Sequence, residues 1–399
     1  KRQVEEGKNV IYHSFDFQNP DQVSAGHIIN HPERDEFGNV QYLSDESGAL
    51  IYDYLGRPQL AYENARRARF ILQGKKAIGA TSTIMNIVYK EGEEGSGRPS
   101  DIMLRRVVVP IGDKGNPYRF DNIVCDEWMV GPDGNDVCIA GAQNMSSVTP
   151  TVTTTSQGDP EADDPYGAIK VVEWEQTVDN LSDASFTNPY EDARAHRGQL
   201  RGDFVVMGYS YTPNWAAARN GNDKYDFYIR RSFDGGQTWT TDPAAAGPIE
   251  HCQLFKQTNG EGDDISFVRD VDGHIVKQEV CTEYDPGEFE QARNMSKIPN
   301  AKTSVIEPRI VATPGAIKVD GTWTGITEDK QDQNVFYLAY GLSTNPKKDP
   351  VTGEQEHSVP LDLFYTFSQD KGQSFVLDSW EVNPDSDGNY AGETVTRWG

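Results

Sequence analysis

Apolar, strand-like runs recur along the chain, and each is followed after a polar loop by a second run that begins with Asp. The first runs are rich in aromatic and β-branched residues, as buried strands are, and they cover residues 82–89, 203–211 and 334–341. The second runs begin at Asp101, Asp226 and Asp362. The same order occurs three times, which predicts an all-β fold with an internal repeat.

Tight-turn signatures follow two of the Asp-led runs. Residues 232–239 read Ser-Phe-Asp-Gly-Gly-Gln-Thr-Trp, and residues 368–375 read Ser-Gln-Asp-Lys-Gly-Gln-Ser-Phe. A hairpin needs residues that accept positive φ and side-chain oxygens that accept hydrogen bonds from turn N–H groups. The residues that meet these needs, with the aromatic residue that begins the next strand, are Ser232, Asp234, Gly236 and Trp239, and Ser368, Asp370, Gly372 and Phe375. A degenerate third copy covers residues 111–118 and contains Asp113.

This signature resembles the Asp-box (BNR) repeat of sialidase-like β-propellers. The resemblance implies a β-propeller over residues 61–399, with residues 1–60 as an irregular segment that is either separate or part of the first blade. One blade holds four strands in about 40–50 residues, and the copies lie about two to three times that distance apart. Each copy is therefore expected to cover two blades, which predicts six blades in all. Seven blades and an incomplete ring are the alternatives.

The resemblance also bears on candidate site residues. Sialidases use three arginines that grip the substrate carboxylate, a Tyr nucleophile backed by Glu, and an Asp acid/base. Arginines in corresponding parts of the repeats make Arg69, Arg201 and Arg309 the candidate ligand-binding residues. Asp boxes in this family lie on turns at the blade periphery, so their carboxylates are expected to hold turns together and not to catalyse.

An aromatic-Glu-x-Ala-Arg pentad recurs at residues 62–66, 190–194 and 289–293. Its Tyr-Glu pair has the residue types of a sialidase nucleophile and its partner. Catalytic machinery is needed once, however, whereas scaffolding is copied with each repeat. The pentads are therefore interpreted as Glu–Arg braces, with an active-site role as the alternative, and no catalytic residue is assigned.

The net charge limits the classes of binding partner, and the cysteine placement indicates the cellular compartment. The formal net charge of −25 disfavours nucleic acid and anionic membranes, and no apolar run reaches the roughly 18 residues of a membrane-spanning helix. Cys125 and Cys138 flank one turn-like stretch, and Cys252 and Cys281 flank a longer polar loop. The interpretation is two local disulfides and an oxidising compartment, and four free thiols are the alternative.

An acidic stretch near the end of the sequence is a candidate calcium loop. Its alternating oxygen-bearing residues and Gly bend are typical of such loops, and the ligands would be Asn383, Asp385, Asp387 and Asn389. The Glu expected at the twelfth position is absent, since Thr394 stands there. A calcium site and an ordinary Asx-rich turn therefore both remain open, and calcium is the one candidate cofactor.

Asn-x-Ser triplets recur at Asn144, Asn180 and Asn294. They fit the N-glycosylation sequon, and they also fit a repeated turn in which Asn and Ser cap backbone N–H groups. The turn is the preferred interpretation.

The expected function is a non-catalytic module, secreted or displayed on a cell surface, that binds a glycan or an extracellular protein through a propeller face. One alternative is an exo-glycosidase of sialidase type, and another is a structural subunit of a larger extracellular assembly. One propeller architecture serves many activities, so the resemblance alone does not choose among the three.

Overall fold

The structure is a computed structural model. It describes residues 29–35, 37–52, 56, 58–74, 82–92, 100–110, 127–130, 134, 136–139, 142–147, 149, 192–212, 225–254, 267–269, 275–277, 279–296, 305–312, 316–319, 322–325, 334–342, 362–375, 380–381 and 394–395. Every regular element among these residues is a β-strand, which confirms the predicted all-β class. No helix that could cross a membrane is found in the described part of the chain.

The chain divides into two compact units, and the first comprises residues 1–62 and 123–141. Its described part holds small hairpins, in which Arg34 bridges Val40 and Ser44 bridges Leu50. The carboxylate of Asp45 accepts hydrogen bonds from the backbone N–H groups of Ser47 and Ala49, at 2.8 and 3.0 Å, and Asp35 does the same one hairpin earlier. The described part of the segment expected to be irregular thus contains two Asp-led turns. The same unit contains β4 (Glu127–Val130) and β5 (Asp136–Ile139).

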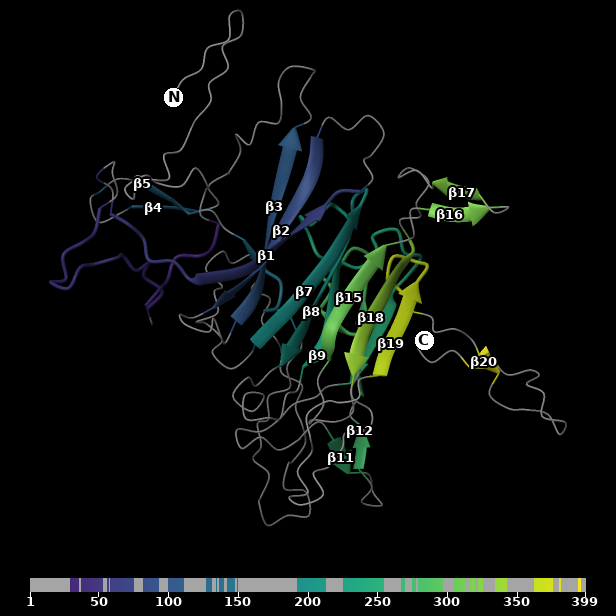
Figure 1. The fold of residues 1–399 in the computed structure, drawn as a ribbon. Helices are drawn as coiled ribbons and strands as arrows, with labels where there is room; N and C mark the ends of the chain where they lie inside the picture. Colours follow the sequence, from purple (N-terminus) through teal and green to yellow (C-terminus); the bar gives the residue numbers. More distant parts are fainter. Residues whose placement is uncertain are drawn as a thin grey trace, which may run out of the picture. The chain divides into compact units, whose positions relative to one another are not determined.

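The second unit comprises residues 63–122 and 142–399, and three antiparallel sheets lie side by side in it in chain order (Figure 1). The first sheet is β1 (Asn64–Leu72), β2 (Ser82–Gly92), β3 (Ser100–Pro110) and β6 (Gln143–Asn144). The second sheet is β7 (Asp192–Arg201), β8 (Phe204–Thr212), β9 (Asp226–Ser232) and β14 (Arg293–Asn294). The third sheet is β15 (Ile306–Ala312), β18 (Phe336–Leu342) and β19 (Asp362–Ser368).

Two-stranded ladders complete the described strands of this unit. They are β10 (Ile249–Leu254) with β13 (Glu279–Tyr284), β11 (Phe267–Arg269) with β12 (Ile275–Lys277), β16 (Ala316–Val319) with β17 (Thr322–Gly325), and β20 (Trp380–Glu381) with β21 (Thr394–Val395). The predicted buried runs are the second strands of the three sheets, β2, β8 and β18, and the Asp-led runs are the third strands, β3, β9 and β19.

Both faces of the second sheet are covered, and every residue of β8 is buried. Residues of alternate parity point to opposite faces of a strand. On one face, Val205 and Met207 join a cluster with side chains of the first sheet. On the other face, Val206 joins a cluster with Phe336 and Leu338 of the third sheet. Neighbouring copies of the repeat therefore pack directly on each other. The expectation of two blades per copy is wrong for these sheets, because no sheet lies between them.

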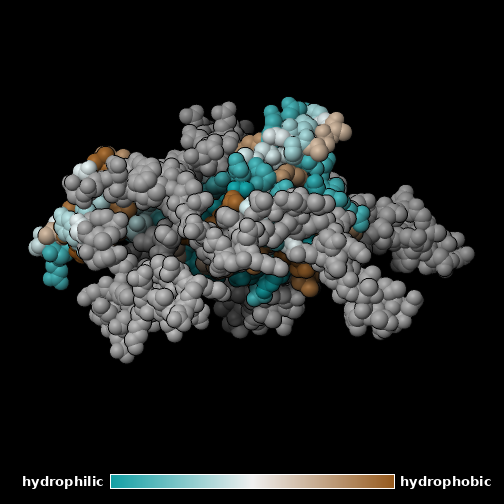
Figure 2. Space-filling model, turned by 90° about the horizontal axis from the view of Figure 1, so that it is seen from above, coloured by the Kyte–Doolittle hydropathy of each residue, from teal (hydrophilic) through white to brown (hydrophobic). Residues whose placement is uncertain are grey.

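The described surface is not uniformly polar. Figure 2 shows hydrophobic residues among hydrophilic ones on the face seen from above. Large apolar side chains that remain exposed on the strands of the first and third sheets include Phe70, Leu72, Val311 and Leu363. Exposed apolar residues on both outer sheets contrast with β8 and β9 of the second sheet, which are buried along their whole length.

The Asn-x-Ser triplets explain why the third strands begin with Asp. In the second sheet, the Ser296 hydroxyl donates to the Asp226 carboxylate at 2.6 Å and accepts the Phe227 N–H at 2.9 Å. The Asn294 side-chain oxygen accepts the Ser296 N–H at 3.2 Å. The same contacts occur in the first sheet among Asn144, Ser146, Asp101 and Ile102. Both asparagines are buried, so these two triplets are structural turns. Asn180 lies outside the described residues.

The third pentad does not match the first two. Residues 62–66 and 190–194 lead into β1 and β7, the first strands of their sheets, whereas residues 289–293 lead into β14, the last strand of the second sheet. The structural counterpart of Arg293-Asn294 is Gln143-Asn144 in the first sheet. The register of the strands, and not the pentad sequence, therefore defines which residues are equivalent.

Gly208 lies so close to neighbouring atoms of the second sheet that a substitution there tests the sheet packing. A Cβ at this position would lie 2.6 Å from the Phe227 ring and 2.8 Å from the Tyr228 carbonyl oxygen. We expect Gly208→Ala to lower the free energy of unfolding by about 1–3 kcal/mol, as overpacking does, measured by chemical denaturation.

Gly247→Ala is the matched control, because a Cβ there meets no atom within 4 Å. It should change the free energy of unfolding by less than about 0.5 kcal/mol. Equal effects of the two substitutions would contradict the described packing of the second sheet.

Candidate functional site

The first strands of the three sheets share an irregularity in the same place. The register of each strand shifts, between Arg66 and Arg69 in β1, between Arg194 and Arg197 in β7, and between Ile306 and Arg309 in β15. A residue with positive φ lies within each shift, and none is glycine: Arg67 at 58°, Ala195 at 57° and Glu307 at 51°. Such conformations cost of order 1 kcal/mol or more each and cluster at functional sites. Strain repeated at three equivalent positions points to this region as a candidate site.

Each irregularity is followed by an arginine. Arg69, Arg197 and Arg309 occupy the same register position, opposite Val88, Gly208 and Ala339 of the second strands. β7 contacts both β1 and β15, so three sheets bring the three arginines to one region. The pKa of Arg197 is lowered to about 10, by burial first and then by the charges of Arg69 and Arg309. The three guanidinium groups therefore form an electrostatically coupled cluster, here called the arginine cluster.

Contacts inside the arginine cluster leave much of its charge uncompensated. The Arg309 guanidinium lies 3.0 Å from the carboxylate of Glu307, and this is the ion pair found for the cluster among the described residues. The Arg197 guanidinium donates to the backbone carbonyl of His196 at 2.7 Å. A concentration of positive charge is conspicuous in a chain whose formal net charge is −25, and it favours an anionic ligand.

Sequence reasoning identified two members of this cluster and missed the third. Arg69 and Arg309 belong to it, whereas Arg201 lies at the end of β7, opposite Phe204. Arg197 takes the place expected for Arg201, because the register shift in β7 sets which residue aligns with Arg69. The spacing Arg-x-x-Arg, shared by residues 66–69 and 194–197, is the signal that could have found it.

A pocket of about 160 Å³ lies beside the arginine cluster. It is formed by β1, β2 and β7, and its lining residues are Arg69, Phe70, Ile71, Val88, His196, Arg197 and Gly198. Gly198 packs tightly, since a Cβ there would lie 2.3 Å from the Ile71 side chain. The pocket combines cationic and apolar walls, as small-ligand sites do.

The Asp boxes use their carboxylates within their own turns. Asp234 accepts hydrogen bonds from the backbone N–H groups of Gln237 and Thr238, at 3.0 and 2.8 Å, and from the Thr238 hydroxyl at 2.5 Å. The Ser232 hydroxyl donates to Asp234 and accepts the Gly236 N–H, both at 2.8 Å. Burial raises the pKa of Asp234, but the hydrogen bonds from Thr238, Ser232 and Gln237 together outweigh burial and keep the pKa below its usual value. The carboxylate is thus fixed by the turn it closes.

The second Asp box repeats this geometry. Asp370 accepts the Ser374 N–H at 2.9 Å and the Ser374 hydroxyl at 2.6 Å, and Ser368 binds Asp370 and the Gly372 N–H. Lys371 stands where the first box has Gly235, with φ of 57° against 78°. The degenerate copy with Asp113 lies outside the described residues. β3 itself continues in register with β2 as far as Pro110.

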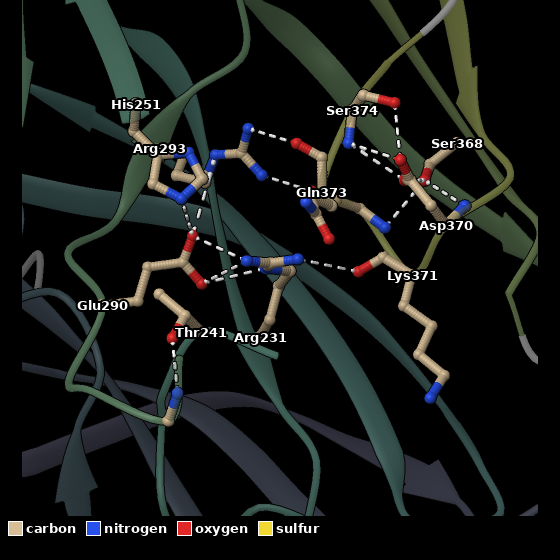
Figure 3. A network of polar contacts seen from close by, with 12 residues as sticks. Arg231, Thr241, His251, Glu290, Arg293, Ser368, Asp370, Lys371, Gln373 and Ser374 are labelled. Atoms are coloured by element: carbon tan, nitrogen blue, oxygen red, sulfur yellow. Dashed lines mark hydrogen bonds and ion pairs between the residues drawn. The ribbon is translucent and has the colours of Figure 1, made fainter. Parts of the chain in front are cut away.

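A buried ion network joins the second Asp box to the second sheet (Figure 3). The Glu290 carboxylate accepts two hydrogen bonds from the Arg231 guanidinium, at 2.9 and 3.0 Å, and lies 2.9 Å from Nε2 of His251. Arg231 also donates to the Lys371 carbonyl at 3.2 Å. Arg293 donates to the carbonyls of Gly372 and Gln373. The expected brace therefore runs from Glu290 to Arg231 of β9, since Arg293 of the same pentad lies 3.8 Å away.

The first and second sheets are joined in a similar way. Gln143, the counterpart of Arg293, donates to the Gln237 carbonyl at 3.0 Å and accepts the indole N–H of Trp239 at 2.7 Å. In both cases the last strand of one sheet holds the Asp-box turn of the next sheet. The Glu290 network is accordingly interpreted as a structural link, although its charged groups are buried and perturbed as those of active sites often are.

The cysteines and the candidate calcium loop are only partly covered by the structure. The register places Cys252 directly opposite Cys281 in the β10–β13 ladder, and Cys138 opposite Trp128 in the β4–β5 ladder. Cys125 lies outside the described residues, as does the loop with Asn383, Asp385, Asp387 and Asn389. The disulfides and the calcium site stay predictions. No group of His, Cys, Asp or Glu suited to a metal ion occurs among the residues that the structure describes.

Comparisons with protein-family models, with curated proteins and with solved structures found no match to this chain. The candidate site therefore has to be judged from its own geometry.

The buried Glu290 carboxylate makes stability depend on pH in a defined direction. Burial raises its pKa, but the Arg231 charge, the hydrogen bond from His251 and the Arg293 charge together outweigh burial and bring the pKa from 4.5 to about 2. Because the folded-state pKa is depressed, the contribution of Glu290 is present above pH 4.5 and is lost as the pH falls towards 2. We expect Glu290→Gln to destabilise the protein at pH 7 by about 3 kcal/mol or more, since Arg231 loses its buried partner.

Thermal or chemical denaturation of both proteins between pH 7 and pH 2 checks this. The stability difference between them should shrink as the pH falls below 4.5. Glu283→Gln, at an exposed position, is the control and should change stability by less than about 0.5 kcal/mol. A difference that is independent of pH would show that Glu290 is not the ionised centre of this network.

Proposed function

We propose that the protein is a non-catalytic β-propeller module that binds the carboxylate of an acidic glycan at the arginine cluster. The observation that carries the proposal is the convergence of Arg69, Arg197 and Arg309 from equivalent positions of three sheets. Each guanidinium presents a planar fork of N–H donors that matches a carboxylate. A secreted or cell-surface location, and the possibility of an extracellular protein as the ligand, belong to the same proposal and remain expectations.

The proposal takes the three sheets as consecutive propeller blades. In its support, β1 and β7 run in the same direction where they meet, through the parallel bridge between Gln73 and Leu200. First strands that run parallel around an axis are what a propeller requires. The sheets also pack in series, since the face of the second sheet that carries Val206 covers the face of the third sheet that carries Leu338. The six blades expected from two blades per copy do not follow from the direct packing of these sheets, so the proposal sets no blade number.

The outer face of the third sheet supports the presence of a further blade. Val311, Tyr337, Leu363 and Tyr365 share this face in the strand register, and they are 52%, 37%, 78% and 47% exposed. The equivalent face of the second sheet, with Val206 and Gly208, is covered by the third sheet. A sheet that is apolar on both faces is typical of one packed between two layers.

The composition of the site favours binding over hydrolysis. A sialidase-type reaction needs a Tyr nucleophile with its Glu partner and an Asp acid/base. No tyrosine, Asp or Glu lines the described pocket. Glu307, the carboxylate paired with the arginine cluster, is 74% exposed in its side chain and held by Arg309. The exo-glycosidase alternative would therefore need groups other than those that the described pocket provides.

Removal of one cluster arginine tests the proposed function. We expect Arg197→Ala to weaken binding of oligogalacturonate, a carboxylated glycan, by about 10- to 100-fold, because a charge-assisted hydrogen bond contributes about 1.5–3 kcal/mol. Isothermal titration calorimetry at low ionic strength measures the change. The methyl ester of the same oligosaccharide has no carboxylate charge and should bind weakly to both proteins.

Arg66→Ala is the matched control, since it removes one positive charge from the same region and Arg66 lies before the register shift. It should leave the affinity within about twofold. Equal binding of the acid and its ester by the unaltered protein would contradict the proposed function.

Covering of the third sheet by a further blade can be tested on the protein surface. If a blade covers the face, Leu363→Asp should lower the melting temperature as a core substitution does, by several degrees, because it buries an unpaired charge. Phe37→Asp is the control, at a position with similar exposure, 80% against 78%. Differential scanning calorimetry compares them. Equally small effects of the two substitutions would contradict a covering blade.

A further inference from the structure

His196 lines the pocket next to the arginine cluster and has a hydrogen-bonding arrangement that sequence reasoning did not assign. Its Nε2 atom lies 2.9 Å from the backbone carbonyl oxygen of Arg67. A carbonyl oxygen only accepts hydrogen bonds, so Nε2 must carry the proton and donate. His196 thereby ties β7 to the strained residue of β1.

The other ring nitrogen is an acceptor without a partner. The side chain is 1% exposed, and Nδ1 makes no hydrogen bond in the described structure. The pKa of His196 is lowered to about 4, chiefly by burial and next by the charge of Arg69. The ring is therefore neutral at pH 7, with the proton on Nε2 and a lone pair on Nδ1. A buried acceptor left unpaired is costly and uncommon in folded proteins.

Three kinds of interaction thus meet in one pocket of about 160 Å³. Arg69 and Arg197 supply positive charge, Phe70, Ile71 and Val88 supply apolar contact, and His196, whose Nδ1 is an unpaired acceptor, forms part of the wall. This volume exceeds that needed by a single water molecule and accommodates a ligand fragment of several atoms. A simple carboxylate would satisfy the arginines and leave Nδ1 unpaired.

We propose that Nδ1 of His196 accepts a hydrogen bond from the ligand, so that the pocket selects carboxylates that carry a hydroxyl group near the acid. The ligand class is a hydroxylated ring acid of the uronic-acid type. The inference rests on the proposed function, because it assumes that the arginine cluster binds the acid group. It adds the determinant of specificity, which the cluster alone does not provide.

Two ligands with the same charge and ring size test the selection. D-glucuronate carries ring hydroxyls, and cyclohexanecarboxylate has none. We expect the full chain to bind D-glucuronate about threefold to tenfold more tightly, the effect of one hydrogen bond, in calorimetric titrations of each acid. Two variants then locate the source of the preference.

His196→Leu removes the acceptor and should bring the two affinities within about twofold, while cyclohexanecarboxylate still binds. His196→Asn keeps an amide oxygen near the position of Nδ1 and should retain the preference for D-glucuronate. A preference that survives in His196→Leu would overturn the assignment to His196. If the unaltered protein binds neither acid, the proposed function itself fails, whereas equal binding of both acids refutes only the role of His196.

The tautomer of His196 provides a second readout, which does not depend on a measured affinity. Two-bond ¹H–¹⁵N correlation spectra of the unaltered protein should show His196 neutral at pH 7 with its proton on Nε2, and the Nδ1 shift should move when D-glucuronate is added. The spectrum of His196→Asn identifies the resonance among the seven histidines. A proton on Nδ1 would rule out its role as an acceptor.

Discussion

Face-to-face burial of the second sheet is the interaction on which the rest of the unit depends. Both faces of β8 are covered, one by the first sheet and one by the third. Without these neighbours, the second sheet would expose apolar side chains on both faces to water. This packing sets the positions of β1, β7 and β15 relative to one another, and with them the positions of the three cluster arginines. The hydrophobic effect thus assembles a cationic site that the charges by themselves would oppose, because like charges repel.

The strained residues explain how the three arginines come to the same level despite that repulsion. Positive φ at Arg67, Ala195 and Glu307 shifts the register of each first strand. The shift puts an arginine at the same level on all three strands. Burial also acts on the charge itself, because it lowers the pKa of Arg197 to about 10, still far above neutral pH. The arginines therefore keep their charge, which an anion can neutralise.

The amount that could be predicted from the sequence differs between local and long-range features. The strands and the Asp-box turns follow from local patterns, such as the Ser, Asp and Gly residues that the turn itself requires. The equivalence of Arg197 with Arg69 depends on a register shift, which the shared Arg-x-x-Arg spacing marks in the sequence and composition does not. His196 was not identified because its importance comes from Arg67, on another sheet, whose carbonyl orients the ring. The third pentad was wrongly taken as equivalent to the first two, because its sequence resembles theirs while its strand lies at the opposite edge of the sheet.

The links between sheets have a direction. Gln143 of the first sheet binds the turn of the second, and Arg231 and Arg293 of the second bind the turn of the third. In both described links the earlier sheet binds the Asp-box turn of the sheet that follows it, so the two ends of the series are not equivalent. An additional sheet that binds through the same contacts has to join the series in the same orientation. Loss of the hydrogen bonds between two sheets would destabilise both of them. The stability of the series therefore depends on the interfaces between sheets more than on the individual sheets.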